Sequence, residues 1–319
     1  MTSASAPGKV ILFGEHAVVS GTAALGGAID LRARVTVQDL PGKILIDACD
    51  LCLKEFSLDL ITGKVVSADA VHFTRYVSAV LKDFDAQDLR VEIKSDLPMA
   101  SGLGSSAAIV VATTAALSQH LGLGLSKKEI AERSHRIEKS VQHGMGSPMD
   151  TALASFGGYL QVSRDILPLN LPELEMIVGY TKQPHDTRSE VAKVQSMRSR
   201  YPDLVGPIFQ AIGAITSRAV PLIREQRLAS LGELMNVNHG LLEALGVGTR
   251  ELCELVYAAR GAGQALGAKL TGAGGGGCMI ALPAPGGSTA LITALKQARG
   301  LAFPVKVGCE GVRLESDLG

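Results

Sequence analysis

The sequence lacks the features that mark several large classes of protein. None of its 319 residues lies in an uninterrupted apolar run of the roughly 18 that span a bilayer. The N-terminal residues 1–9 do not show the basic-then-apolar order of a secretory signal. Lysine plus arginine equals aspartate plus glutamate at 31 each, so no net field attracts the whole chain to nucleic acid. We therefore expect a cytoplasmic protein with no nucleic-acid or membrane partner.

Cysteine and histidine are too scattered to indicate a disulfide framework or a zinc hydrolase. The five cysteines are odd in number, which favours reduced thiols in a cytosolic setting. Cys49 and Cys52 form a C-x-x-C, but no second pair or flanking histidine accompanies them. We interpret them as two partly buried thiols rather than a redox or metal site. None of the seven histidines stands in a His-Glu-x-x-His motif.

The residues that are present predict a folded α/β chain with two differently built halves. A hydrophobic content of 46% with 19% charged residues excludes a disordered chain, and the length suffices for two lobes. The N-terminal half mixes short strands with helices, whereas the C-terminal half is mostly helical. We expect strands near 31–37, 44–46, 89–93, 159–162, 278–282 and 304–307, and helices near 71–84, 107–117, 126–141, 187–199, 204–225, 228–245 and 249–266. A soft boundary near 165–180 divides the chain into domains 1–170 and 171–319.

The segment Pro98–Ala108 carries the clearest chemical signal. It follows an alternating strand and leads into an apolar run typical of a buried helix. Two glycines and two serines at a helix N-terminus make an anion site, because the first amides of a helix have no internal partner and the helix dipole adds positive potential. A serine hydroxyl there can reach the magnesium of a bound phosphate. No Gly-Lys-Ser/Thr follows, so this is not a Walker loop.

A dinucleotide-binding loop is the rival interpretation, since Gly102-x-Gly104-x-x-Ala107 matches G-x-G-x-x-A. That motif requires an acidic residue about 20 positions on, at the end of a second strand. Here the corresponding residues, Ser126–Glu129, open a helix with a capping box. The nicotinamide interpretation is therefore disfavoured.

A second glycine run, Gly272–Gly277, lies between two apolar strand-like segments. Glycine clusters are most often flexible turns. A backbone that approaches a phosphate closely, with positive φ angles, explains a run without nearby charge better. Together with the first loop, the second interpretation is favoured.

Three polar residues have both a functional and an ordinary interpretation. Lys9 opens an apolar strand, so it is either a solvated side chain or a fixed cation of a site. Glu138, on an expected helix, would by itself be a solvated surface residue. Asp150 stands at the start of an apolar helix, where local sequence favours an N-cap.

The motifs together resemble those of the GHMP kinase superfamily, which includes galactokinases, homoserine kinases and mevalonate kinases. Ala6–Lys9 is similar to the first motif, Pro98–Ala108 to the second and Lys269–Cys278 to the third. The match runs in the same order over almost the whole chain. It implies a two-lobed α/β (α+β) fold, with a β-rich phosphate-binding lobe followed by a helix-rich lobe.

Within the superfamily the chain is most similar to the mevalonate kinases, particularly the short archaeal type. Gly14–Val19 and Met235–Val247 carry that resemblance, and the Asp-Tyr that follows Glu-His in galactokinases is absent. The resemblance implies an ATP:alcohol phosphotransferase that phosphorylates the 5-hydroxyl of mevalonate in isoprenoid biosynthesis. It also implies a homodimer.

The resemblance assigns a role to individual residues. Asp150 accepts or orients the proton of the substrate hydroxyl, and Lys9 lowers the pKa of that hydroxyl and neutralises the transferring phosphoryl group. Ser106 and Glu138 hold Mg²⁺. The phosphate-binding residues are Pro98, Ala100, Ser101, Gly102, Leu103, Gly104, Ser105, Ser106 and Ala107. The mevalonate-binding residues are Glu15, His16, Thr187, Gly272 and Ala273.

Two other functions stay open at this point. The chain could be another kinase of the superfamily, acting on phosphomevalonate or a sugar. It could also be a nucleotide-binding sensor without catalysis, although Lys9, Ser106, Glu138 and Asp150 occurring together argue against that.

Overall fold

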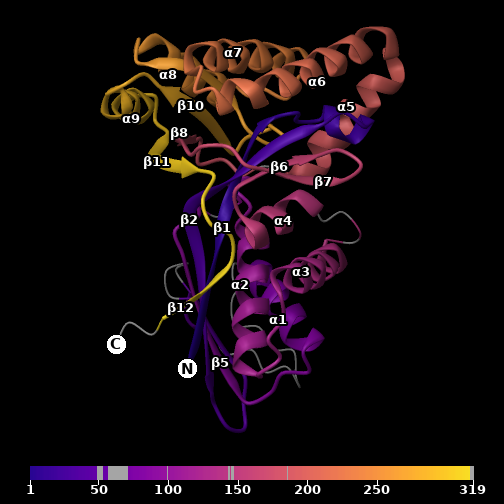
Figure 1. The fold of residues 1–319 in the computed structure, drawn as a ribbon, viewed down its shortest axis with the longest axis vertical. Coiled ribbons are helices and arrows are strands. Elements are labelled where there is room, and N and C mark those ends of the chain that lie inside the picture. The colour runs from indigo at the N-terminus through magenta and orange to yellow at the C-terminus, as the bar shows by residue number, and fades with distance from the viewer. Residues whose placement is uncertain are drawn as a thin grey trace.

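The computed structural model describes residues 1–48, 53–56, 71–98, 100–142, 144, 147–184 and 186–316, and the predicted thiol pair Cys49 and Cys52 lies outside these ranges. Strands β1 (Thr2–Phe13), β2 (Ala24–Asp39) and β5 (Leu89–Ser95) run along the long axis of the molecule (Figure 1). Helices α1 (Val71–Asp83), α2 (Ser105–His120) and α3 (Lys127–Val141) lie beside them at one end. The other end holds α6 (Pro202–Arg224), α7 (Leu228–Ala244), α8 (Arg250–Gly261) and α9 (Ser288–Gln297). The predicted α/β fold is confirmed. None of the helices in the described ranges is long and apolar enough to cross a membrane.

The described strands form one sheet. They are β1 (Thr2–Phe13), β2 (Ala24–Asp39), β3 (Leu45–Ala48), β4 (Leu53–Phe56), β5 (Leu89–Ser95), β6 (Tyr159–Val162), β7 (Ile166–Leu169), β8 (Leu174–Tyr180), β9 (Ala265–Leu270), β10 (Cys278–Pro283), β11 (Leu301–Val307) and β12 (Arg313–Glu315). The main path has the order β4-β3-β5-β2-β11-β8-β10-β9, with β1 and β6 both paired to β2. All pairs are antiparallel except β3 with β5. A single residue pair, Val307 with Ile29, joins β11 to β2.

The N-terminal strands are longer than the sequence pattern predicts. Strands β1 and β2 have 12 and 16 residues, and they pair antiparallel with register shifts after Pro7 and Ile11. Apolar and polar residues alternate only in the part of β2 that has one face in solvent. Its first half is buried on both faces, so no period of two is visible there.

Four helices cover or follow these strands: α1 (Val71–Asp83), α2 (Ser105–His120), α3 (Lys127–Val141) and α4 (Pro148–Phe156). Helix α2 is buried along nearly its whole length because it packs on β1 and β2 with one face and on α1, α3 and α4 with others. The predicted capping box of α3 is present, with Ser126 accepting from the Glu129 amide and Glu129 accepting from the Ser126 amide. The packing of α2 on these strands and helices holds in place the end of the phosphate loop that leads into it.

The C-terminal half contains α5 (Thr187–Arg200), α6 (Pro202–Arg224), α7 (Leu228–Ala244), α8 (Arg250–Gly261) and α9 (Ser288–Gln297). The prediction that a helix continues to residue 266 is wrong, since α8 ends at Gly261 and strand β9 begins at Ala265. Gly263, at φ 66°, makes the turn between them. Strand β8 was not predicted at all. It is a short apolar run in the middle of the sheet, and because it is buried on both faces its sequence shows no alternation of apolar and polar residues.

The far end of the described chain returns to the first strand. Strand β12 pairs with β1 through Ser3–Glu315, Ala4–Leu314 and Ser5–Arg313. Arg32 of β2 holds the approach by donating to the carbonyl oxygens of Glu310 (2.9 Å) and Gly311 (2.7 Å).

Candidate active site

The phosphate loop ends in a helix N-terminus with no side-chain cap. Gly104, the N-cap of α2, is in the left-handed conformation at φ 77°. The first helical hydrogen bond runs from the Ala108 amide to the Gly104 carbonyl (3.0 Å), so the amides of Ser105–Ala107 have no acceptor in the helix. The loop itself is braced by the Ser101 hydroxyl, which donates to the Pro98 carbonyl (2.7 Å). This is the geometry of an anion site.

Lys9 connects strand β1 to this loop. Its backbone amide donates to the Leu103 carbonyl (2.8 Å) and its Nζ donates to the Gly102 carbonyl (2.9 Å). The side chain lies so close to Gly104 that a Cβ there would be 2.9 Å from Lys9 Cγ. The residue is 6% exposed, so the solvated alternative is wrong.

Asp150 faces Lys9 from the first turn of helix α4. Its Oδ2 lies 3.6 Å from Lys9 Nζ, and its Oδ1 accepts from the Ser147 hydroxyl (3.0 Å). The N-cap interpretation is wrong, because Ser147 is the N-cap and Asp150 is the third residue of the helix. The carboxylate is therefore free to point at the loop, with one oxygen oriented by Ser147 and the other toward the lysine.

Glu138 comes to the same place from helix α3 and is only 2% exposed, so it is not a solvated surface residue. Its Oε1 accepts from the Ser106 hydroxyl and from the Gln142 side chain, both at 3.2 Å. Its Oε2 is buried without a hydrogen-bond partner. Burial, followed by the negative charge of Asp150, raises the pKa of Glu138 to about 8.

A divalent cation fits this part of the site. A buried carboxylate with one unsatisfied oxygen, a second carboxylate near it and a serine hydroxyl are the hard oxygen donors that Mg²⁺ prefers. Without a cation the carboxylate is protonated at neutral pH, because its pKa is raised. A bound cation would therefore stabilise the ionised form of Glu138.

The glycine-rich loop between β9 and β10 takes a backbone path open only to glycine. Residues 272 and 274–277 all have positive φ angles. A Cβ on Gly274 would lie 2.3 Å from the Val247 carbonyl oxygen, and one on Gly275 would lie 2.6 Å from Glu190 Cγ. The run is therefore a defined loop, not a flexible turn.

His16 joins the end of β1 to that loop. Its Nε2 lies 2.8 Å from the Ala273 carbonyl oxygen, which makes it the donor in this bond. Burial lowers the pKa of His16, so the ring is neutral at neutral pH. Its backbone has a positive φ of 60°.

Glu15 is held away from solvent by a second buried lysine. Lys269 of β9, fully buried, donates to Glu15 Oε1, and Asn238 of α7 donates to Oε2 (3.2 Å). Burial lowers the pKa of Lys269, and Glu15 opposes that shift. The structure therefore ties Glu15 into a buried ion pair that supports the chain next to His16.

Thr187 begins helix α5 and is exposed. The next residue, Arg188, reaches the C-terminal end of α3, where its Nη2 donates to the Gln142 carbonyl (3.3 Å). Because the Gln142 side chain also donates to Glu138, the start of α5 is linked to the carboxylate cluster.

The sequence patterns do not single out three of these contacting residues, Ser147, Gln142 and Arg188. They mark Lys269 only as the start of the third motif. Gln142 stands four positions after Glu138 on one helix face, a spacing that could have revealed it. Lys269 opens the third motif but its partner is 254 positions away, which no local spacing shows.

Comparison with known proteins gives the family. The GHMP kinases N terminal domain matches residues 72–158, and the GHMP kinases C terminal domain matches residues 219–298. Mevalonate kinase of Pyrococcus horikoshii is 46% identical over 328 aligned residues, covering 98% of this chain and 97% of that protein. The chain belongs to the mevalonate kinase family.

Further relatives agree along the full length. Mevalonate kinase of Pyrococcus furiosus is 41% identical and covers 98% of both chains. The crystal structure of L. major mevalonate kinase in complex with R-mevalonate superimposes with a TM-score of 0.83 at 26% identity, covering 96% of each chain. Lactococcus lactis galactokinase, at 19% identity, shares the fold (TM-score 0.77, covering 98% of this chain and 94% of that one). As a member of the mevalonate kinase family, the chain is a kinase of the GHMP type.

Proposed function

We propose that this enzyme transfers the γ-phosphoryl group of ATP to the 5-hydroxyl of mevalonate, yielding 5-phosphomevalonate. The observation that carries the proposal is the double contact of Lys9, whose ammonium lies between the phosphate loop at Gly102 and the carboxylate of Asp150. One cation thus touches both the place for the phosphates and the residue proposed to receive the hydroxyl. Phosphoryl transfer asks mainly for such positioning and charge neutralisation.

The amides of Ser105–Ala107 would hold the transferring and bridging oxygens of the triphosphate. Asp150, oriented by Ser147, would accept or orient the proton of the attacking hydroxyl. Lys9, 3.6 Å away, would stabilise the alkoxide as it forms and the negative charge on the γ-phosphoryl oxygens. Each step uses a group already fixed by a hydrogen bond to the scaffold.

Ser106 and Glu138 are the residues that would hold Mg²⁺. When bound, the ion would neutralise negative charge on the phosphates. The orphan Oε2 of Glu138 supports this assignment, because a buried carboxylate oxygen without a partner is costly unless a ligand satisfies it.

We assign recognition of mevalonate to the region where His16 contacts Ala273, next to Gly272, and to Thr187 at the start of α5. A neutral histidine and glycine backbone amides can bind hydroxyl and carboxylate groups at little steric cost. Glu15 would act indirectly, because its ion pair with Lys269 holds the backbone next to His16 in place.

Steady-state assays with ATP and excess Mg²⁺ test the proposal. We expect kcat/KM for R-mevalonate to exceed that for phosphomevalonate and for galactose by at least about 10³-fold, since a site built for one set of polar groups rejects substrates that leave them unpaired. A higher kcat/KM for phosphomevalonate or galactose would assign the chain to another GHMP kinase activity. ATP binding with no turnover of any of the three would indicate a sensor.

We further propose that the chain has two domains divided at 170/171, forms a homodimer and is located in the cytoplasm. Light scattering on the purified protein measures the second directly, and a mass equal to one chain of 33.2 kDa would overturn it.

A further inference from the structure

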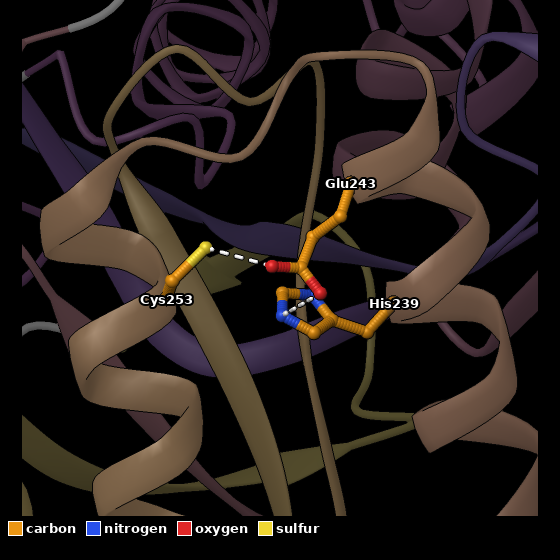
Figure 2. Close-up of side chains that lie close together, drawn as sticks. All are labelled: His239, Glu243 and Cys253. Atoms are coloured by element: carbon orange, nitrogen blue, oxygen red, sulfur yellow. Dashed lines mark hydrogen bonds and ion pairs between the residues drawn. The ribbon is translucent and has the colours of Figure 1, made fainter.

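A second cluster of ligand-type side chains lies between helices α7 and α8. Two of its members belong to the Met235–Val247 stretch that carries the family resemblance, but the proposed chemistry uses none of them. His239 and Glu243 stand one turn apart on α7, and Cys253 faces them from α8 (Figure 2). The Cys253 thiol donates to Glu243 Oε1 (3.1 Å), and His239 Nε2 lies 3.6 Å from Glu243 Oε2. One ligand atom from each residue lies within 4.8 Å of the other two.

His239 points an unsatisfied nitrogen into this cluster. The residue is fully buried, and its Nε2 has no hydrogen-bond partner, because 3.6 Å to the glutamate is too long for one. Burial lowers the pKa of His239 to about 4, so the ring is neutral and can offer a lone pair. A buried polar atom without a partner is costly, and a ligand between the three side chains would satisfy it.

We propose that His239, Glu243 and Cys253 form a binding site for a thiophilic divalent cation of the zinc type. Imidazole, carboxylate and thiolate are a donor set that Zn²⁺ accepts and Mg²⁺ does not. Zinc–ligand bonds of about 2.0–2.3 Å in a tetrahedron separate neighbouring ligand atoms by roughly 3.2–3.8 Å. The 3.1 Å from Cys253 and the 3.6 Å from His239 end on different oxygens of Glu243, and one ligand atom from each side chain lies within 4.8 Å of the others. The three side chains would therefore have to close around the ion by up to about 1 Å.

The charges of the cluster balance the cation. A thiolate and a carboxylate together carry two negative charges, and the histidine carries none. Burial and Glu243 raise the pKa of Cys253 to about 11, so the metal displaces a thiol proton when it binds. The Glu243 side chain is 32% exposed, which leaves a route for the ion and a position for water as the fourth ligand.

Two features oppose binding and limit its strength. The Leu270 amide donates weakly to His239 Nδ1 (3.4 Å), and this bond is lost when the ring proton moves to Nδ1 so that Nε2 can bind a metal. The Arg260 guanidinium, anchored on the Ala268 carbonyl (2.7 Å), adds a positive charge that lowers the pKa of His239 and repels a cation. We therefore expect a moderate affinity compared with sites formed by four cysteines.

The site would lock the α7–α8 connection. A Cβ on Gly248 of that connection would lie 3.2 Å from Cys253 Sγ, and the neighbouring Val247 carbonyl accepts from the Gly275 amide (2.9 Å). Metal binding would thus hold α7 to α8 beside the glycine-rich loop, at a place separate from the Ser106–Glu138 cation site.

Cobalt titration of chelator-treated protein tests the proposal in excess Mg²⁺, which fills oxygen sites but not thiolate sites. We expect one equivalent of Co²⁺ to produce a thiolate-to-cobalt charge-transfer absorption that Zn²⁺ bleaches. Cys253→Ser should abolish the band and weaken Zn²⁺ binding, measured by calorimetry, by about 100-fold or more. Cys309→Ser is the matched control, because Cys309 is also half-buried but donates to the Lys306 carbonyl, not to a carboxylate.

The outcomes separate cleanly. Glu243→Gln keeps the helix but removes a charged ligand, and it should weaken Zn²⁺ binding while leaving the folded state intact. Absence of a thiolate band in the unsubstituted protein, or a band that survives Cys253→Ser and disappears in Cys309→Ser, would overturn the proposal. Zn²⁺ should also raise the melting temperature of the unsubstituted protein and of Cys309→Ser, but not that of Cys253→Ser.

Discussion

Two pairs of a buried lysine and a carboxylate, both in the described part of the chain, differ in how closely their members approach. Lys9 and Asp150 lie 3.6 Å apart, and each has a second partner on its own side, the Gly102 carbonyl and the Ser147 hydroxyl. Lys269 and Glu15 are in direct contact, and the remaining carboxylate oxygen is taken by Asn238. The members of the first pair are too far apart for a direct hydrogen bond, whereas those of the second are hydrogen-bonded to each other.

This difference separates chemistry from support. A pair without a direct hydrogen bond keeps both charged groups available to a third group, so a hydroxyl or a phosphate can bind beside them. In a directly bonded pair the two charges neutralise each other. Removing one of its members therefore lowers the stability of the fold rather than the rate of the reaction. The two pairs are connected along the chain, since Glu15 follows the strand that carries Lys9 and precedes His16.

The largest effect should come from Asp150→Asn. The amide cannot accept the hydroxyl proton, so we expect kcat to fall by about 10²–10⁴-fold while the dissociation constant for ATP changes by no more than a few-fold. Asp203→Asn is the control, because that exposed aspartate also stands in a first turn begun by proline. Turnover near that of the unsubstituted enzyme would remove Asp150 from the reaction and make the two lysine pairs alike.

Lys269→Met should instead reduce stability. It leaves the Glu15 carboxylate buried without its cation, which we expect to lower the free energy of unfolding by about 3–5 kcal/mol, measured by urea denaturation. Lys9→Met should lower kcat by no more than Asp150→Asn does, but it should cost only about 1 kcal/mol in the same assay, since Asp150 is partly exposed and can be hydrated.

The double variant Lys269→Met/Glu15→Gln checks the cause. Removing the buried charge should restore most of the lost stability. Equal losses in the single and double variants would mean that packing around Lys269, not the unpaired carboxylate, is responsible.

The smallest effect concerns Glu138, whose pKa is raised to about 8. In the unfolded chain a glutamate titrates near pH 4.3, so the folded state binds one more proton between these values. Stability is then fully present below about pH 4.3 and is lost as pH rises through about 8. Without nucleotide or Mg²⁺, Glu138→Gln should melt a few degrees above the unsubstituted protein at pH 9, and the gap should close toward pH 5.

Glu132→Gln, an exposed position on the same helix, should show no such pH-dependent gap. If Glu138→Gln also shows none, the buried carboxylate is already neutralised by Lys9, and the two acids of the site would have to be assigned anew.

Sequence predicted the parts of the molecule that are built from neighbours in the chain. The phosphate loop, the capping box of α3 and the glycine-rich loop each depend on spacing over fewer than a dozen residues, and all are present. Strand β8 and the Lys269–Glu15 pair were not predicted, because both depend on contacts between distant segments. Local sequence favoured an N-cap role for Asp150, and only tertiary structure, with Ser147 as the cap, shows its carboxylate turned to Lys9.

The pairing of β12 with β1 also sets a condition on how the molecule is made. Strand β1 is synthesised some 310 residues before Arg313–Glu315, so the edge that receives them stays uncovered during that interval. An unpaired edge during that interval can join another nascent chain. Closure of this edge brings together segments some 310 residues apart, and pairing over such a separation is intrinsically slow.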